Sequence, residues 1–181
     1  YGVTKCEAED YILQESNGII FRLATVFGVS SRMRLDLLVN EFVYKLLTDK
    51  YITIFEKTFV RNFIHIQDVA NVFEFMIDNY DKHQGEIYNV GLSDTNINKQ
   101  QLVERIQKCI PNTSVTYSDY YEDPDKRDYI VSNEKIESTG WKPQYSLDEG
   151  IKELIEAYKM IVPQESSHYR NAFPLSYGQS L

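Results

Sequence analysis

The chain opens on Tyr1 and Lys5, which form a Tyr-x-x-x-Lys pattern. Residues four apart on a helix lie on one face, about one turn from each other, so a phenol and an ammonium group at these positions can share one small site. A nearby cation lowers the pKa of a phenol, which is ordinarily near ~10. We therefore interpret Tyr1 and Lys5 as a candidate acid/base pair that exchanges a proton with a hydroxyl or ketone group. The same spacing also occurs by chance in many helices, so the rest of the sequence has to support this interpretation.

Composition limits the class of protein that carries this pair. The 181 residues carry a formal charge of −8 and suffice for one domain with a proper core, and this acidic balance disfavours a nucleic-acid surface. Cys6 and Cys109 are isolated, which favours neither a disulfide framework nor a zinc site. No apolar run approaches the ~20 residues that span a bilayer, and no signal peptide is evident. We expect a cytoplasmic protein that binds neither nucleic acid, membrane nor metal.

The first elements predicted after the pair alternate between helix and strand. A helix over residues 5–16 should end at Asn17-Gly18, and a short apolar run over residues 18–28 is typical of a strand buried on both faces in a parallel sheet. Function commonly lies at the carboxyl end of such strands, which here is the segment from Thr25 into a polar loop. A helix over residues 35–47 should follow, then a candidate strand over residues 51–55.

The second half of the chain continues the alternation. We expect a strand over residues 59–66, and Asp68 stands where an N-cap is wanted for a helix over residues 69–79. Another buried strand should cover residues 85–91, and Asn98 can cap a helix that reaches Cys109. The remaining predicted elements are an edge strand over residues 114–117, a charged loop at 122–128, a short helix from Asn133 that ends at Gly140, and a helix from a capping box at Ser146–Glu149 to about Ile161. Nowhere does a Gly-x-Gly-x-x-Gly or Gly-x-x-Gly-x-x-Gly turn follow a strand.

Several short motifs succeed one another in a fixed order. After the Tyr1 and Lys5 pair come Arg22-Leu23-Ala24-Thr25-Val26-Phe27-Gly28, Arg61-Asn62-Phe63-Ile64-His65-Ile66-Gln67-Asp68-Val69-Ala70, Tyr88-Asn89-Val90-Gly91, Asp125-Lys126-Arg127-Asp128 and Gly140-Trp141-Lys142-Pro143. In this order they resemble the second half of the extended short-chain dehydrogenase/reductase superfamily, the nucleotide-sugar epimerases and dehydratases. The resemblance covers roughly residues 1–158, and its most specific segment is 61–70. Thr25 stands where the family usually has asparagine.

The resemblance implies a reaction and a cofactor. Tyr1 would be the catalytic acid/base, and Lys5 would hold the nicotinamide ribose of NAD or NADP and lower the pKa of the tyrosine. Hydride would pass between the nicotinamide and a carbon of the sugar. Epimerases, dehydratases and ketoreductases share this step, and the sequence does not separate them.

The resemblance also implies substrate contacts. Arg61 and Arg127 would grip the diphosphate of a nucleotide sugar bidentately, although surface salt bridges would also account for them. Thr25 would bond a substrate oxygen, and Asn40 lies in a region that covers the nucleotide, although an ordinary amphipathic helix would explain it equally well. His65 and Asp68 are interpreted as structural, with His65 bonding backbone.

The fold class implied is α/β: the second half of an extended Rossmann-type, doubly wound fold plus a small α/β substrate-binding domain. Residues 1–30 would be a remnant of the dinucleotide-binding domain, about 31–162 the nucleotide-sugar-binding part, and 163–181 a tail. Without the glycine-rich turn, this chain should need a complementing N-terminal half to bind the cofactor. The resemblance also implies a homodimer formed through the Tyr1 and Lys5 helix. The alternative is a noncatalytic nucleotide-sugar-binding or interaction module, which the threonine at position 25 would suit.

Overall fold

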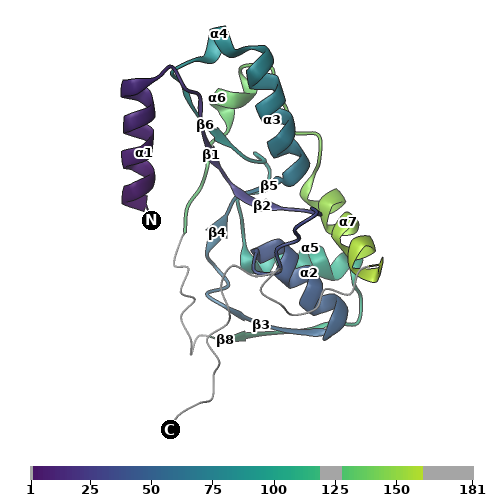
Figure 1. Ribbon diagram of the computed structural model, residues 1–181. Helices are drawn as coiled ribbons and strands as arrows, with labels where there is room; N and C mark the ends of the chain where they lie inside the picture. Colours follow the sequence, from purple (N-terminus) through teal and green to yellow (C-terminus); the bar gives the residue numbers. More distant parts are fainter. Residues whose placement is uncertain (1, 119–127, 161–181) are drawn as a thin grey trace.

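The computed structural model describes residues 2–118 and 128–160, in which helices are interspersed with single strands and groups of strands along the chain (Figure 1). The helices are α1 (Gly2–Glu15), α2 (Leu38–Thr48), α3 (Ile66–Asp78), α4 (Tyr80–His83), α5 (Lys99–Cys109), α6 (Glu134–Glu137) and α7 (Leu147–Met160). The strands are β1 (Ile20–Leu23), β2 (Thr25–Phe27), β3 (Tyr51–Phe55), β4 (Val60–Arg61), β5 (Phe63–His65), β6 (Ile87–Val90), β7 (Ile97–Asn98) and β8 (Ser114–Ser118). This order confirms the predicted α/β class. Most of the predicted charged loop at 122–128 and the tail from 163 lie outside the described residues.

The apolar run over residues 18–28 forms parallel pairs, as predicted, but as two short strands. β1 pairs with β6 and β2 pairs with β5, both in parallel. The change of partner occurs at Ala24, whose N–H donates to the Val90 carbonyl at 2.9 Å, while the N–H of Thr25 donates to the Asn62 carbonyl at 2.9 Å. The first half of this run is therefore held on β6 and its carboxyl half on β5.

A second group of strands lies at the other end of the molecule. β3 pairs in parallel with β8, and β4 pairs with β7 in an antiparallel arrangement. Figure 1 shows β3 and β8 beyond α2 and α5, on the far side from β1, β6 and α3. The predicted edge strand at 114–117 is therefore confirmed as β8, and the chain builds two connected α/β regions.

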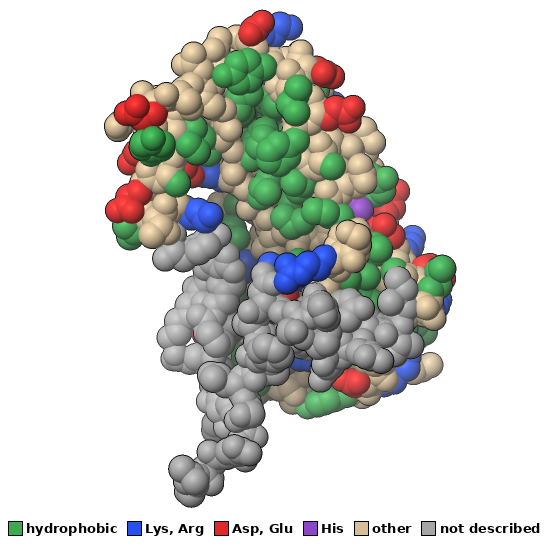
Figure 2. All heavy atoms as spheres, in the orientation of Figure 1, with side chains coloured by type: hydrophobic (Ala, Val, Ile, Leu, Met, Phe, Trp, Pro, Cys, Tyr) green, Lys and Arg blue, Asp and Glu red, His purple; other side chains and the backbone are tan. Residues whose placement is uncertain are grey.

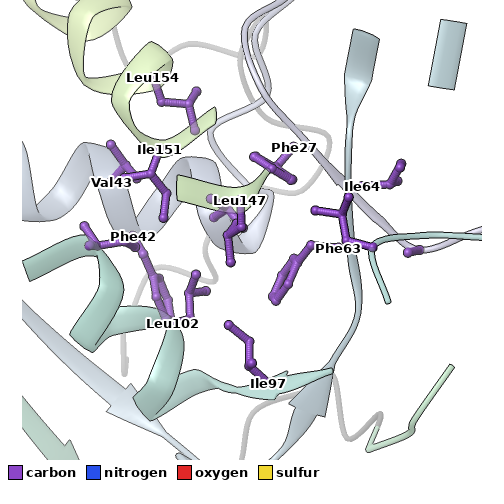
Figure 3. Close-up of a cluster of buried hydrophobic side chains, with 14 of the residues drawn as sticks. Phe27, Phe42, Val43, Phe63, Ile64, Ile97, Leu102, Leu147, Ile151 and Leu154 are labelled. Carbon is purple, nitrogen blue, oxygen red and sulfur yellow. The ribbon is translucent and has the colours of Figure 1, made fainter. Parts of the chain in front are cut away.

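The core lies where α2, α5 and α7 meet β2 and β5. Figure 3 shows side chains from these elements and from β7 gathered in one cluster, and none of the labelled residues is more than 8% exposed. Fully burying a side chain of this kind contributes roughly 1.5–3 kcal/mol. The labelled residues are Phe27, Phe42, Val43, Phe63, Ile64, Ile97, Leu102, Leu147, Ile151 and Leu154. Helix α7, the last helix within residues 2–118 and 128–160, is therefore packed against α2, α5 and β5.

Two of the predicted helix caps are confirmed. The Asn98 side chain accepts from the N–H of Gln101 at 2.8 Å, and the Gln101 side chain accepts from the N–H of Asn98 at 2.9 Å. At α7, Ser146 and Glu149 form the same reciprocal pair. Each box satisfies two backbone donors that a helix start leaves without a partner.

The predicted cap of α3 was wrong. The helix begins at Ile66, and its N-cap is His65, whose Nδ1 accepts from the N–H of Gln67 at 3.3 Å. This confirms that His65 bonds backbone. Asp68 is instead fully buried, and its carboxylate accepts from the backbone N–H groups of Gln144 at 2.8 Å and Tyr145 at 3.0 Å. The carboxylate that the local pattern assigned to a helix cap therefore bonds two backbone N–H groups that lie 76 and 77 residues away in sequence.

Helix α1 stands beside the body of the molecule (Figure 1), and none of its side chains is buried. Arg22 of β1 forms a bidentate ion pair with Glu9 of α1, in which Nε and Oε1 are 2.9 Å apart. Arg22 thus links β1 to α1. The chain reverses at Asn17-Gly18, so the N-terminal end of α1 lies on the side of the carboxyl end of β1. Within the described residues, no helix is long and apolar enough to cross a membrane.

Candidate functional site

A cleft of about 850 Å³ lies at the carboxyl ends of β1 and β2. Its wall is built from these strands, the loop that follows them, the start of α2, the first residue of α3 and one residue from the segment before α6. The lining residues are Leu23, Ala24, Thr25, Val26, Phe27, Gly28, Ser30, Arg32, Arg34, Leu37, Asn40, Ile66 and Tyr129. It lies where the position of the parallel strands predicts a ligand site.

The turn at Gly28 shapes the cleft. Gly28 has φ of 117°, in the region that side-chain-bearing residues rarely adopt, and its N–H donates to Asn40 Oδ1 at 3.1 Å. The amide group of Asn40 in turn donates to the carbonyl of Arg34 at 2.9 Å. Asn40 is 1% exposed. Its carboxamide therefore holds both ends of the loop between β2 and α2 together.

Two arginines give the cleft a basic wall in an otherwise acidic protein. Arg32 is exposed, and Arg34 forms a bidentate pair with Asp36, with Nε to Oδ1 at 3.0 Å and Nη2 to Oδ2 at 2.8 Å. The hydrogen bond to Asp36 raises the pKa of Arg34. Guanidinium groups suit phosphate and carboxylate oxygens because they donate in a fixed planar fork.

Arg61 lies next to the cleft and is not among its lining residues. It is 3% exposed, its Nη1 donates to the Val60 carbonyl at 3.0 Å, and its Cζ lies 5.7 Å from the centre of the Tyr129 ring. Tyr129 itself lines the cleft. Asp128 fixes this segment, because its carboxylate accepts from the N–H of Val60 at 2.8 Å. The guanidinium of Arg61 is thus close to Tyr129 on the cleft wall.

The structure brings together two of the site residues predicted from sequence. Thr25 and Asn40 line the same cleft. Lys5 lies on the exposed helix α1 and is not among the lining residues, and Arg61 is adjacent as described above. Tyr1 and Arg127 lie outside the described residues. Their assignments, like that of Lys5, stay predictions.

Sequence reasoning named none of four polar side chains of the cleft, Ser30, Arg32, Arg34 and Tyr129, as site residues. Ser30 adds a hydroxyl near the loop arginines, and Tyr129 adds an aromatic ring. The signal for Ser30 was its place in the polar loop after a strand end. Tyr129 gave no local signal, since a contact across 68 residues holds its neighbour Asp128 in place. Hydroxyls, guanidiniums and an aromatic face together suit an anionic ligand that is rich in hydroxyl groups. No cluster of three or more His, Cys, Asp or Glu that could hold a metal occurs within residues 2–118 and 128–160.

Comparison with known proteins gives the family. The model of the NAD dependent epimerase/dehydratase family matches residues 1–91, half of the chain. The chain is 33% identical over 106 residues to dTDP-D-glucose 4,6-dehydratase from Mus musculus, a match that covers 55% of this chain and 29% of that protein.

Solved structures share the fold. A UDP-glucose 4-epimerase from Thermotoga maritima with UDP-glucose superimposes with a TM-score of 0.75 at 22% identity, covering 90% of this chain and 54% of that one. A UDP-glucose 4-epimerase from Thermus thermophilus in complex with NAD gives a TM-score of 0.70 at 17% identity, with 87% and 51% covered. The chain thus spans about half the length of these structures and less than a third of the mouse dehydratase. With its parallel strands, cleft and ordered motifs, the chain belongs to the NAD dependent epimerase/dehydratase family.

Proposed function

We propose that the chain is the nucleotide-sugar-binding part of an NAD(P)-dependent epimerase, dehydratase or ketoreductase. The observation that carries this proposal is the arginine-walled cleft at the carboxyl ends of the parallel strands in a chain of this family. Arg32 and Arg34 would contact the phosphates, with Arg61 and Arg127 completing the grip on the diphosphate. Thr25 and Ser30 would donate to sugar hydroxyls. Within this proposal, residues 1–30 belong to the cofactor-binding domain, about 31–162 to the sugar-nucleotide part, and 163–181 form a tail.

The catalytic pair would act at the edge of this cleft. The N-terminal end of α1, which carries Lys5, lies on the side of the carboxyl end of β1, as the cleft does. This placement fits a lysine that reaches a cofactor ribose, and a bound nicotinamide would supply the hydride acceptor. Tyr1 would take or return the proton of the sugar hydroxyl at its phenol oxygen. Lys5 would favour the ionised phenol through its charge.

The remainder of the cofactor site would come from a complementing N-terminal half. Support comes from an apolar face over β1 and α3, made of Leu23, Phe73 and Ile77, which are 40%, 48% and 72% exposed. Figure 2 shows hydrophobic side chains gathered over this part of the molecule. The ring of Phe73 packs edge-on against Phe21 of β1, with centres 4.9 Å apart. An apolar face of this kind marks an interaction site in a folded protein.

The exposed surface of helix α1 supports a contact between two copies of the chain. None of its side chains is buried, and Val3 and Tyr11 are 71% and 67% exposed. A helix in this state gains stability when it packs on another helix. We infer a homodimer formed through α1, which sedimentation equilibrium of the chain and of a Tyr11→Lys variant would test. A wild-type chain that stays monomeric at high concentration would refute it.

Calorimetric titration tests the substrate assignment. UDP-glucose, dTDP-glucose, GDP-mannose and UDP alone are titrated into the chain and into Arg32→Ala and Arg61→Ala variants. Loss of one charge-assisted hydrogen bond, about 1.5–3 kcal/mol, should raise Kd roughly ten- to hundredfold. Arg105→Ala is the matched control, because Arg105 lies on α5 and pairs with Asp148 at 3.6 Å. If a folded wild-type chain binds none of these compounds, the proposal fails.

A further inference from the structure

A buried histidine joins helix α7 to the turn that borders the cleft. His65 ends β5, is 2% exposed, and its two ring nitrogens have different partners. Nδ1 accepts from the backbone N–H of Gln67 at 3.3 Å, and Nε2 lies 2.6 Å from Oε2 of Glu153 on α7. Because Nδ1 uses its lone pair as an acceptor, the ring proton lies on Nε2, which donates to the carboxylate. Glu153 therefore selects one tautomer and one orientation of the ring.

The oriented ring supports the Gly28 turn. A Cβ atom added to Gly28 would lie 2.6 Å from Nε2 of His65, so the ring is packed directly against this glycine. The same ring stacks on Tyr145, with centres 4.5 Å apart and planes 19° apart, and meets Phe27 edge-on at 5.4 Å. On its other side, the N–H of Gly28 is held by Asn40. Gly28 is thus fixed between two side chains, and both are anchored elsewhere in the fold.

Helix α7 packs directly against the His65 ring and against Phe27, the residue before Gly28. A Cβ atom on Gly150 would overlap the ring of Phe27 and would lie 3.0 Å from Cδ2 of His65. Glu153 is one helical turn further along, and its side chain is 44% exposed although it bonds a buried ring. The hydrogen bond spans 88 residues of sequence. A shift of α7 would therefore move the His65 ring and, with it, the turn.

We propose that Glu153 is a positioning residue: acting through His65, it fixes the Gly28 turn and so sets the affinity of the cleft for its ligand. The effect on affinity rests on the proposed function above. The effect on the turn does not, because it follows from contacts within the chain. The effect on the turn and the effect on ligand affinity are therefore measured in separate experiments.

Nuclear magnetic resonance of the 15N-labelled chain tests the turn. Long-range 1H–15N correlations report which nitrogen of His65 carries the proton, and hydrogen exchange reports how firmly the Gly28 amide is held. In the wild type we expect the proton on Nε2. In Glu153→Ala, exchange at Gly28 should become about tenfold faster relative to the amides of α5, because a buried donor loses its acceptor. In Glu153→Gln, which keeps an acceptor oxygen, both signals should stay close to wild type.

Glu156→Ala removes a carboxylate from the same helix, where Glu156 forms an exposed ion pair with Lys159 at 2.6 Å, and should leave both signals unchanged. The positioning role is overturned if Glu153→Ala leaves Gly28 exchange unchanged, or if Glu156→Ala or Glu153→Gln accelerates it equally. A wild-type ring protonated on Nδ1 alone would overturn the role without any variant.

Titration of UDP-glucose tests the link to affinity. In Glu153→Ala, Kd should rise roughly 2- to 30-fold, the range typical of residues that act on a site through others. An unchanged Kd together with faster Gly28 exchange would overturn this link. If the wild-type chain binds no nucleotide sugar, the proposed function fails, while the resonance measurements still decide the role of Glu153.

Discussion

Replacing Asp68 tests the long-range contact that the local sequence pattern did not predict. Its buried carboxylate accepts from the backbone N–H groups of Gln144 and Tyr145, in the segment that leads into α7. An aspartate that capped α3 would behave differently from one that anchors this segment. At an N-cap, asparagine is about as good as aspartate, so Asp68→Asn would be nearly neutral, and Asp68→Ala would cost about 1 kcal/mol.

The structure predicts larger losses. Asp68→Asn keeps one acceptor oxygen, but its amide group then faces a backbone donor. A hydrogen bond to a charged acceptor is worth about 1.5–3 kcal/mol, so the loss of one of the two should reduce the free energy of unfolding by about 2 kcal/mol. Asp68→Ala loses both, and we expect a reduction of about 3–4 kcal/mol, less than the full sum because water can reach the partly buried segment.

Urea unfolding is the assay for these variants. Trp141 is the single tryptophan, is 5% exposed and precedes Gln144 by three residues, so its fluorescence reports on this segment directly. Far-ultraviolet circular dichroism follows the whole chain. Asn98→Ala is the control for a true N-cap and should cost about 1 kcal/mol. The anchoring role of Asp68 is refuted if Asp68→Asn is neutral and Asp68→Ala costs no more than Asn98→Ala.

Three other changes have expected outcomes. Gly91→Ala would place a Cβ atom on the side-chain oxygen of Asn62, so thermal unfolding should show a loss of about 1–3 kcal/mol. The hydrogen bond from Arg22 lowers the pKa of Glu9, so the ion pair that joins α1 to β1 is intact above the ordinary value of 4.5 and is lost as the pH falls through the lower pKa of the folded state. Amide resonances of α1 that do not change on acidification would contradict this. Burial raises the pKa of Tyr158, so the wild type should lose more stability than Tyr158→Phe between about pH 9 and 11, as unfolded chains release that proton first. Equal losses in chemical unfolding would count against it.

The elements that sequence predicted well are those that short-range chemistry determines. The capping boxes at Asn98 and Ser146 involve partners three residues away, and both form. The apolar run over residues 18–28 was predicted to be a strand of a parallel sheet, and its parallel pairing is confirmed. Burial on both faces was wrong for its first half, because Arg22 and Leu23 of β1 are exposed. The change of pairing partner at Ala24 was not predicted, because it depends on which strand lies beside each half of the run.

The candidate site was predicted only in part, for the same reason. Thr25 could be placed at a strand end from its position alone. Asn40 gave no sign that its carboxamide would bond the Gly28 turn and Arg34, because helical periodicity does not show which distant backbone groups a buried amide meets. Tyr129 reaches the cleft through a contact with β4, and no pattern in the sequence reports such a contact.

The wide sequence separation of the partners in the core has a consequence for how the chain acquires its fold. Parallel pairing joins Ile20 to Ile87 and Tyr51 to Ser114, and the hydroxyl of Tyr158 on α7 bonds the carbonyl of Asn40 across 118 residues. Chains dominated by such distant contacts fold slowly, because a long loop must close before any contact stabilises it. During synthesis β1 must therefore await β6 and β3 must await β8, and the apolar surfaces of α2 and β2 that α7 covers stay exposed until α7 has left the ribosome. We expect this interval to make nascent chains dependent on chaperones.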